Sequence, residues 1–213
     1  RDIGVTGVQT CALPICAGSG AQRESSPDMI QAYLKARGLD VLTFAGYSGA
    51  GYEDPQAMAR QVEAVLARRS PKRVLINAGA TAEGIGAVYA IAKRRGFSTL
   101  GIVSSLARDE GVKLSPCVDL VFFVKDSSWG GSLPGSDNLS PTSETIVAVS
   151  SSFVAIGGGD IARTELLAAR RQGKSVEFFP ADMNHRLAID KRSEEHTSEL
   201  QSRQYLVCRL LLE

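Results

Sequence analysis

Residues 153–165 are the stretch of this chain whose residue types and spacing are best suited to chemistry. An apolar run at 153–156 is followed by three consecutive glycines, Gly157, Gly158 and Gly159. Two acidic residues, Asp160 and Glu165, come after the glycines. Glycine lets a ligand approach the main chain closely, and the start of a helix presents N–H groups and a positive dipole end. The pattern predicts a phosphate-binding turn with Asp160 as helix cap. A tight strand-to-helix turn that binds nothing is the alternative.

Other side chains near this stretch could extend a ligand site. Arg163 could hold a phosphate through two hydrogen bonds, or it could lie on a solvated helix face. Trp129, the only tryptophan, could stack on a base or anchor its own loop. Asp182 and His185 could bind phosphate or supply a general acid, or they could cap the final helix. Glu165 could act at a sugar, or it could pair with Arg163 or cap its helix.

A second glycine-rich segment lies near the start of the chain. It consists of Gly18, Ser19 and Gly20, and it precedes a helix that we expect to begin at Pro27 and to end at Gly38. A glycine loop before a helix normally follows a strand. We therefore expect that a first strand has been lost before residue 17. The surviving loop is a second candidate phosphate site, with a flexible chain end as the alternative.

Both ends of the chain resemble translated sequencing-adapter DNA. Residues 7–15 back-translate to a string whose reverse complement, read one base out of frame, encodes residues 192–200. Unrelated protein termini would not be reverse complements of each other. We therefore expect residues 1–16 and 192–213 to be adapter-derived and poorly packed. Residues 17–191 then form a single domain that is cut at both ends.

The composition limits the classes of partner and the cellular compartment that we expect for this protein. Cys16 straddles the adapter junction, so Cys117 is expected to be a lone thiol, which favours a reducing, cytoplasmic location. His185 is the only histidine outside the adapter-like ends, which excludes a histidine-rich metal site. A net charge of +1 gives no argument for nucleic acid, and no apolar run is long enough for a membrane span. The expected partner is a small molecule, with the cofactor unknown, no metal, and a homo-oligomer left open.

Short apolar runs alternate with helical patterns along the whole chain. Strands are expected at residues 41–45, 73–77, 99–103, 118–124, 153–156 and 176–179, with the lost strand as a seventh. This alternation predicts an α/β fold, a Rossmann-like doubly wound parallel sheet between two layers of helices. Ligands of such sheets bind beyond the carboxyl ends of the strands. Gly79 and Thr81, in the loop after the strand at 73–77, therefore join the candidate site.

One apparent motif favours a different chemistry. Gly79 and Gly84, with Tyr89 four residues before Lys93, are similar to parts of the short-chain dehydrogenases. In that family the glycines lie on the first strand and the tyrosine lies far downstream, whereas here they share one helix. We expect Tyr89 in the core and Lys93 in solvent. NAD(P)-dependent hydride transfer stays as the weaker alternative.

Residues 158–165, Gly-Gly-Asp-Ile-Ala-Arg-Thr-Glu, resemble the Pro-Gly-Gly-x-Gly-Thr-x-x-Glu region of the SLOG superfamily. That superfamily includes the Lonely Guy (lysine-decarboxylase-like) phosphoribohydrolases and the DNA-processing protein DprA. The resemblance implies a prokaryotic, Rossmann-like nucleotide-binding domain. It also implies that Gly158 and Gly159 cradle phosphate and that Glu165 acts at the ribose during N-glycosidic cleavage.

The departures from that motif favour binding over hydrolysis. Gly157 replaces the proline, and Ile161 and Ala162 replace the Gly-Thr pair. We therefore expect a domain that binds a nucleotide or nucleotide sugar and that could cleave the N-glycosidic bond of a nucleoside phosphate. A non-catalytic nucleotide-sensing module, joined to a partner domain, is the alternative.

Overall fold

The computed structural model describes residue 16 and residues 20–194, with side chains described as far as residue 189. Seven strands form one sheet in the order β1-β5-β4-β3-β2-β6-β7, and every neighbouring pair is parallel. The strands are β1 (Ala21–Glu24), β2 (Asp40–Gly46), β3 (Val74–Asn77), β4 (Ser98–Ser104), β5 (Leu120–Val124), β6 (Ser152–Ile156) and β7 (Ser175–Phe179). The predicted Rossmann-like α/β fold is confirmed.

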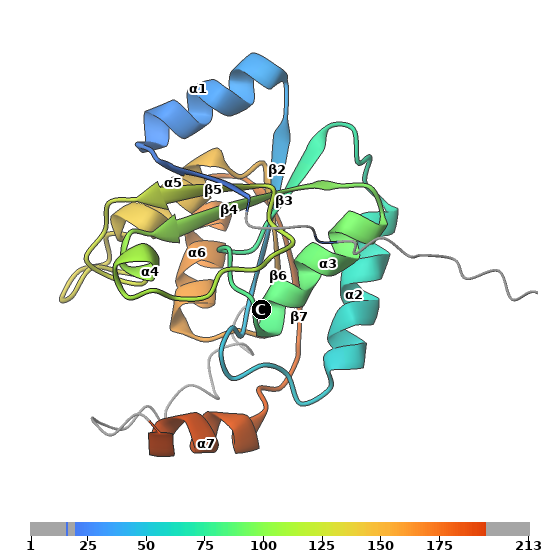
Figure 1. The fold of residues 1–213 in the computed structure, drawn as a ribbon, viewed down its shortest axis with the longest axis vertical. Helices are drawn as coiled ribbons and strands as arrows, with labels where there is room; N and C mark the ends of the chain where they lie inside the picture. The colour runs from blue at the N-terminus through green and yellow to red at the C-terminus, as the bar shows by residue number, and fades with distance from the viewer. Residues whose placement is uncertain (1–15, 17–19, 195–213) are drawn as a thin grey trace, which may run out of the picture.

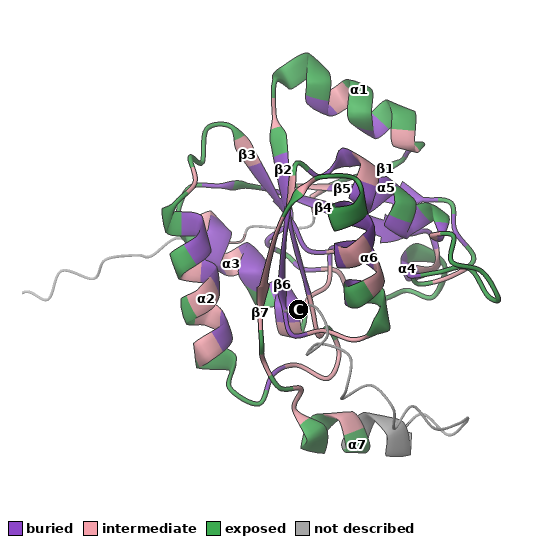
Figure 2. Cartoon of the chain, turned by 180° about the vertical axis from the view of Figure 1, so that it is seen from behind, coloured by how far each residue is buried: buried purple, intermediate pink, exposed green. Residues whose placement is uncertain are grey.

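Helices cover both faces of this sheet (Figure 1). They are α1 (Pro27–Arg37), α2 (Pro55–Ala67), the short helices η1 (Gly84–Gly86) and α4 (Leu106–Asp109), α3 (Ala87–Arg94), α5 (Pro141–Val149), α6 (Asp160–Arg171) and α7 (His185–Glu194). One buried cluster joins the sheet to α2 and α3, and a second joins it to α1, α5 and α6. Figure 2 shows the buried residues along the strands and the exposed residues on the outer helix surfaces. The sheet is therefore the middle of three layers.

Local signals in the sequence explain where the first helix begins and ends. The Ser26 hydroxyl accepts a hydrogen bond from the Met29 amide, and Pro27 is the first helical residue. Gly38 ends the helix in the left-handed region, with φ of 59°. Among the described residues, no helix is both long enough and apolar enough to span a membrane.

The strand that completes the sheet is β1, and it lies at a different place in the sequence from the additional strand that we predicted. We expected it before residue 17 and expected a loop after Gly20, but β1 begins directly after Gly20 and pairs with β5 at the edge of the sheet. The prediction of a loop was wrong because all four residues of β1 are exposed, so the strand has no apolar pattern. Backbone hydrogen bonds at both ends hold it instead, from the Ala21 amide to the Asp119 carbonyl (3.1 Å) and from the Ser25 amide to the Phe123 carbonyl (3.0 Å).

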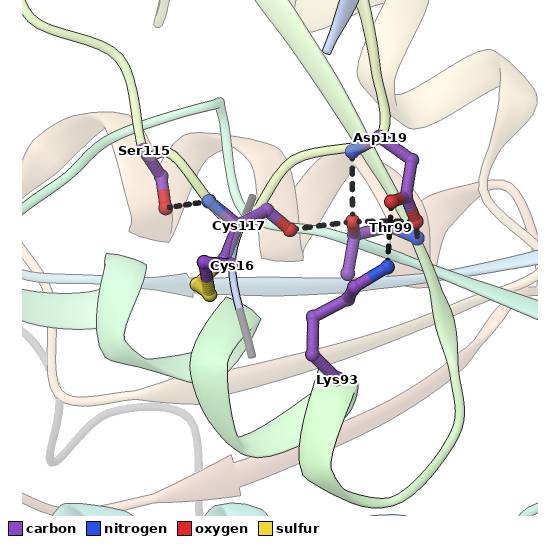
Figure 3. The surroundings of a disulfide bond; sticks show 6 residues. All are labelled: Cys16, Lys93, Thr99, Ser115, Cys117 and Asp119. Atoms are coloured by element: carbon purple, nitrogen blue, oxygen red, sulfur yellow. Dashed lines mark hydrogen bonds and ion pairs between the residues drawn. A yellow bond between two sulfur atoms is a disulfide. The ribbon is translucent and has the colours of Figure 1, made fainter. Parts of the chain in front are cut away.

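Cys117 is not a lone thiol in the structure, because it forms a disulfide with Cys16 (Figure 3). The prediction was wrong because edge pairing of β1 brings the start of the chain beside the turn before β5, across 101 residues of sequence. The Cys117 carbonyl accepts a hydrogen bond from the Thr99 hydroxyl (2.7 Å), which also fixes this turn. The argument from a lone thiol for a reducing compartment loses its basis. Residues 1–15 and 195–213 of the adapter-like ends lie outside the described residues.

Candidate functional site

The strand order reverses between β2 and β6, which are neighbours in the sheet. From β2 the chain continues through β3, β4 and β5 on one side, whereas β6 and β7 lie on the other side. The helix after β2, α2, packs on one face, and the helix after β6, α6, packs on the opposite face. The two connections therefore separate at the carboxyl edge, and the crevice beside such a switch point is where doubly wound sheets bind ligands.

The glycine turn after β6 packs directly against the turn after β2. Gly157 and Gly158 have φ of 55° and 114°, in the region that favours glycine. A Cβ atom on Gly158 would lie 2.6 Å from the Ala162 Cβ and 3.3 Å from the Gly46 Cα. A Cβ atom on Gly157 would lie 2.6 Å from the Tyr47 ring. Close packing at the switch point therefore requires both glycines.

Gly159 occupies the position before α6, and no side chain caps that helix. The prediction that Asp160 is the cap was wrong. Gly159 takes the extended conformation (φ −91°, ψ −159°) and its carbonyl accepts the first helical hydrogen bond, from the Arg163 amide at 3.0 Å. Asp160 therefore lies inside the first turn, where it is exposed, as is Arg163. The two side chains bring opposite charges to the same helix end.

The turn after β2, residues 46–52, also belongs to the switch point. The Tyr47 carbonyl accepts from the Ile85 amide at 2.7 Å, and the Tyr52 hydroxyl donates to the Ile156 carbonyl at 2.9 Å. The Tyr47 and Tyr52 rings meet edge to face, with centroids 5.5 Å apart. No ligand-binding residue was predicted in this loop. Its signal was the Gly-Tyr-Ser-Gly-Ala-Gly string between a strand and a helix.

Gly79 and Thr81 shape the loop after β3, on the same edge. The Gly79 amide donates to the Asn77 carboxamide oxygen at 3.2 Å. Thr81 forms an isolated antiparallel bridge with Leu114, and its hydroxyl accepts from the Glu83 amide at 3.4 Å. Both candidates thus lie at the carboxyl edge, where Gly79 is engaged by its own loop and Thr81 also by the segment between α4 and β5.

Tyr89 is a core residue, as predicted. Its fully buried hydroxyl accepts from the Ala78 and Ala80 amides and donates to the Leu100 carbonyl, all within 2.9 Å. Burial raises the pKa of this hydroxyl far above its ordinary value. Lys93 forms an ion pair with Asp119 at 2.6 Å. Tyr89 and Lys93 therefore do not form the catalytic pair of a dehydrogenase.

Glu165 is buried between α5 and α6. The Ser143 hydroxyl donates to Glu165 Oε1 at 2.6 Å and accepts from the Gly131 amide at 2.7 Å. Burial raises the pKa of Glu165 to about 7, although the hydrogen bond from Ser143 lowers it in part. The carboxyl group therefore neither caps its helix nor pairs with Arg163. It joins two helices to the loop that precedes α5.

Trp129 lies in that loop, residues 125–140, with 47% of its surface exposed. The buried Asp126 carboxylate holds the start of the loop, accepting from the Ser128 and Thr142 amides at 2.8 Å each. Burial raises the pKa of Asp126, but these hydrogen bonds outweigh it and leave the pKa below its ordinary value. A Cβ atom on Gly130 would lie 3.4 Å from the Ile161 side chain. The loop thus rests on the first turn of α6, beside the switch point.

Asp182 and His185 lie on the same edge, after β7, and both are exposed. Asn184, and not either of them, caps α7, because its side-chain oxygen accepts from the Leu187 amide at 3.0 Å. The prediction of a cap formed by Asp182 or His185 was therefore wrong. The Glu53 amide donates to the Asp182 carbonyl at 3.0 Å. This contact places the loop after β7 against the turn after β2.

Gly20 is separated from the other candidates. It precedes β1 at the amino edge of the sheet, against the backbone of Val118 and Asp119. Because β1 is parallel to β5, its start lies at the edge opposite the switch point. The expected second phosphate loop is therefore not part of this site, and Gly18 and Ser19 lie outside the described residues.

A cavity of about 320 Å³ also lies away from the switch point. It is bounded by β1, by α4 and the turn after it, and by β5, and Gln22, Arg108 and Phe123 are among its lining residues. Arg108 is engaged there in ion pairs with Glu24 and Asp109. Within residues 20–194 and Cys16, no group of three or more His, Cys, Asp or Glu residues could hold a metal ion.

Comparison with known proteins supports the fold. No protein-family model and no curated protein matches this sequence. A molybdenum cofactor binding protein from the phototrophic bacterium Rippkaea orientalis is similar in structure, with 16% identity, coverage of 73% of this chain and 85% of that chain, and a TM-score of 0.50. The molybdenum cofactor carrier protein of Chlamydomonas reinhardtii has 17% identity, coverage of 73% and 97%, and a TM-score of 0.45. At such identities the likeness concerns the arrangement of strands and helices.

Proposed function

We propose that this protein binds a nucleotide at the carboxyl edge of the sheet, beside the packed turns after β2 and β6 and at the start of α6. The observation that carries the proposal is the meeting of two glycine turns and the start of α6 where the strand order reverses. Gly159 has no side chain to fill that helix end, so main-chain N–H groups and the positive dipole end can receive a phosphate. Arg163 on the first turn adds a positive charge, which Asp160 partly offsets.

The other parts of the nucleotide have candidate partners on the same edge. Trp129 is half exposed, next to Gly130, which lies against Ile161 of α6, and its ring can stack on a base. Asp182 and His185 are exposed after β7, within reach of a sugar or a phosphate. A protein of similar structure is named for binding the molybdenum cofactor, which is a precedent for a small-molecule ligand on this fold.

Glu165 is our candidate for chemistry on a bound nucleoside phosphate. With a pKa of about 7 it exists in both protonation states at neutral pH, which suits a general acid or base. In hydrolysis of the N-glycosidic bond, water would add to the ribose C1, the bond to the base would break, and the carboxylate would accept a proton from the water. The leaving base would take up a proton in turn.

A second function, binding without catalysis, is favoured by the surroundings of the same residue. The Glu165 carboxyl group is hydrogen-bonded to Ser143 and lies under Gly130, so its contacts are already those of a structural link. The protein would then be a nucleotide sensor.

One experiment separates these functions. The full chain is incubated with AMP, ADP-ribose and NAD, and thermal stabilisation and release of free base are measured together. Stabilisation with base release that Glu165→Gln abolishes and Glu144→Gln retains indicates a glycosidic hydrolase, because Glu144 is exposed on α5. Stabilisation without release indicates a binding module. The proposal fails if none of these nucleotides stabilises the protein.

A further inference from the structure

A single buried hydroxyl connects three segments of the candidate site. Ser143, in the first turn of α5, donates to Glu165 of α6 and accepts from the Gly131 amide of the preceding loop. Both distances are short, at 2.6 and 2.7 Å, and Ser143 is fully buried. A hydroxyl that donates to a carboxylate is a better acceptor for a second donor. The two hydrogen bonds therefore reinforce each other.

The loop turn that this hydroxyl holds lies directly over the carboxyl group. Gly130 and Gly131 have φ of 119° and 84°, which favour glycine. A Cβ atom on Gly130 would lie 3.0 Å from Ser143 Oγ and 3.9 Å from Glu165 Oε1. The turn therefore covers Glu165, and movement of the turn away from α6 would admit water to it.

Trp129 is held between two anchor points of this loop. On one side the Asp126 carboxylate accepts from the Ser128 and Thr142 amides. On the other side Gly131 is held by Ser143, and its carbonyl accepts from the Ser140 amide at 2.8 Å. The position of Trp129 in the loop therefore depends on both anchors.

Among the residues that the structure describes, no neighbouring charge compensates the Glu165 carboxylate. Asp126 on the loop is occupied by its own hydrogen bonds, and Glu177 of β7 pairs with Arg68 and Arg69, which directly follow α2 on the opposite face. The remaining titratable residues of the loop, α5, the start of α6 and β2 are exposed; they are Lys125, Asp137, Glu144, Asp160, Arg163 and Asp40. Ionisation of Glu165 is therefore opposed by burial alone and is favoured once water reaches the group.

We propose that Ser143 is the positioning residue of this site. Its hydroxyl holds the Glu165 carboxyl group toward the loop. The same hydroxyl holds the turn at Gly130 and Gly131, next to Trp129, over that carboxyl group. This inference rests on the proposed function where it concerns ligand binding. The contact between Ser143 and Glu165 can be tested without a ligand. It couples the protonation of one carboxyl group to the closure of the loop that carries the stacking side chain. Because Glu165 has a raised pKa when covered, the closed loop is favoured at low pH and loosens as pH rises through about 7.

The test uses Trp129 as its own reporter, because it is the only tryptophan in the chain. Quenching of its fluorescence by acrylamide is measured from pH 5 to pH 9 without ligand. Ser143→Ala removes both hydrogen bonds, which should shift the closed-to-open equilibrium of the loop about tenfold or more and raise the quenching constant. Ser136→Ala is the matched control, since Ser136 Oγ accepts from the Asn138 amide within the same loop and touches neither Glu165 nor Gly131.

Glu165→Gln gives an independent reading if Ser143→Ala does not fold. In the parent protein, quenching should rise with pH around a midpoint near 7, and Glu165→Gln should abolish that rise. Quenching that is independent of pH in the parent, or equal in Ser143→Ala, Ser136→Ala and the parent, overturns the proposal. Failure of every nucleotide to bind would refute the proposed function while leaving this ligand-free result unchanged, so the two can be told apart.

Discussion

Replacement of Glu165 by glutamine should remove most of the pH dependence of stability between pH 4.5 and pH 7. Burial raises the pKa of Glu165 from 4.5 to about 7 in the folded protein. Since one pKa unit corresponds to 1.36 kcal/mol, the protonated group stabilises the folded state by about 3 kcal/mol relative to the ionised one. This stabilisation is fully present below pH 4.5 and is lost as pH rises through about 7. The parent protein should therefore lose about 3 kcal/mol over that interval.

Urea unfolding followed by circular dichroism, at half-unit steps from pH 4.5 to pH 8, measures this difference. The free energy of unfolding of Glu165→Gln should be nearly level where that of the parent protein falls. Glu144→Gln, an exposed substitution on the neighbouring helix, should retain the parent slope. Parallel pH profiles for the parent and Glu165→Gln would show that Glu165 is hydrated in solution, and the reasoning from its burial would be refuted.

Three further predictions test other parts of the structure. Gly159→Ala should weaken AMP binding about tenfold, as measured by titration calorimetry. Its free energy of unfolding should stay within about 0.5 kcal/mol of the parent value, because Gly159 has an ordinary φ of −91°. Unchanged affinity for AMP would contradict a phosphate site at the start of α6. Tyr89→Phe should cost about 2–4 kcal/mol in urea unfolding, since its hydroxyl bonds three buried backbone groups; a loss under 1 kcal/mol would contradict that core role. Reduction with dithiothreitol should destabilise the protein by about 4 kcal/mol through loss of the Cys16–Cys117 link; an unchanged thermal midpoint would mean that the link does not form.

The alternation of strands and helices could be predicted because parallel strands covered on both faces are continuous apolar runs. All six strands expected from such runs are present, within a few residues of their expected bounds. β1 was not predicted, because its exposed side chains carry no apolar pattern and only pairing with β5 defines it. The cap of α6 was predicted at Asp160, one residue too late, because glycine can also occupy the position before a helix. Which residue occupies that position depends on the backbone conformation of Gly159.

The sequence by itself determined what is local: the apolar runs, the glycine turns that follow them, and the helix boundaries such as Pro27 and Gly38. Only the tertiary structure decided that β2 and β6 are neighbours, that Gly20 lies at the opposite edge, and that Glu165 meets Ser143. The physical reason is the range of the interactions. Turns and caps depend on residues a few positions apart, whereas strand order and the burial of a carboxyl group depend on packing between segments that are distant along the chain.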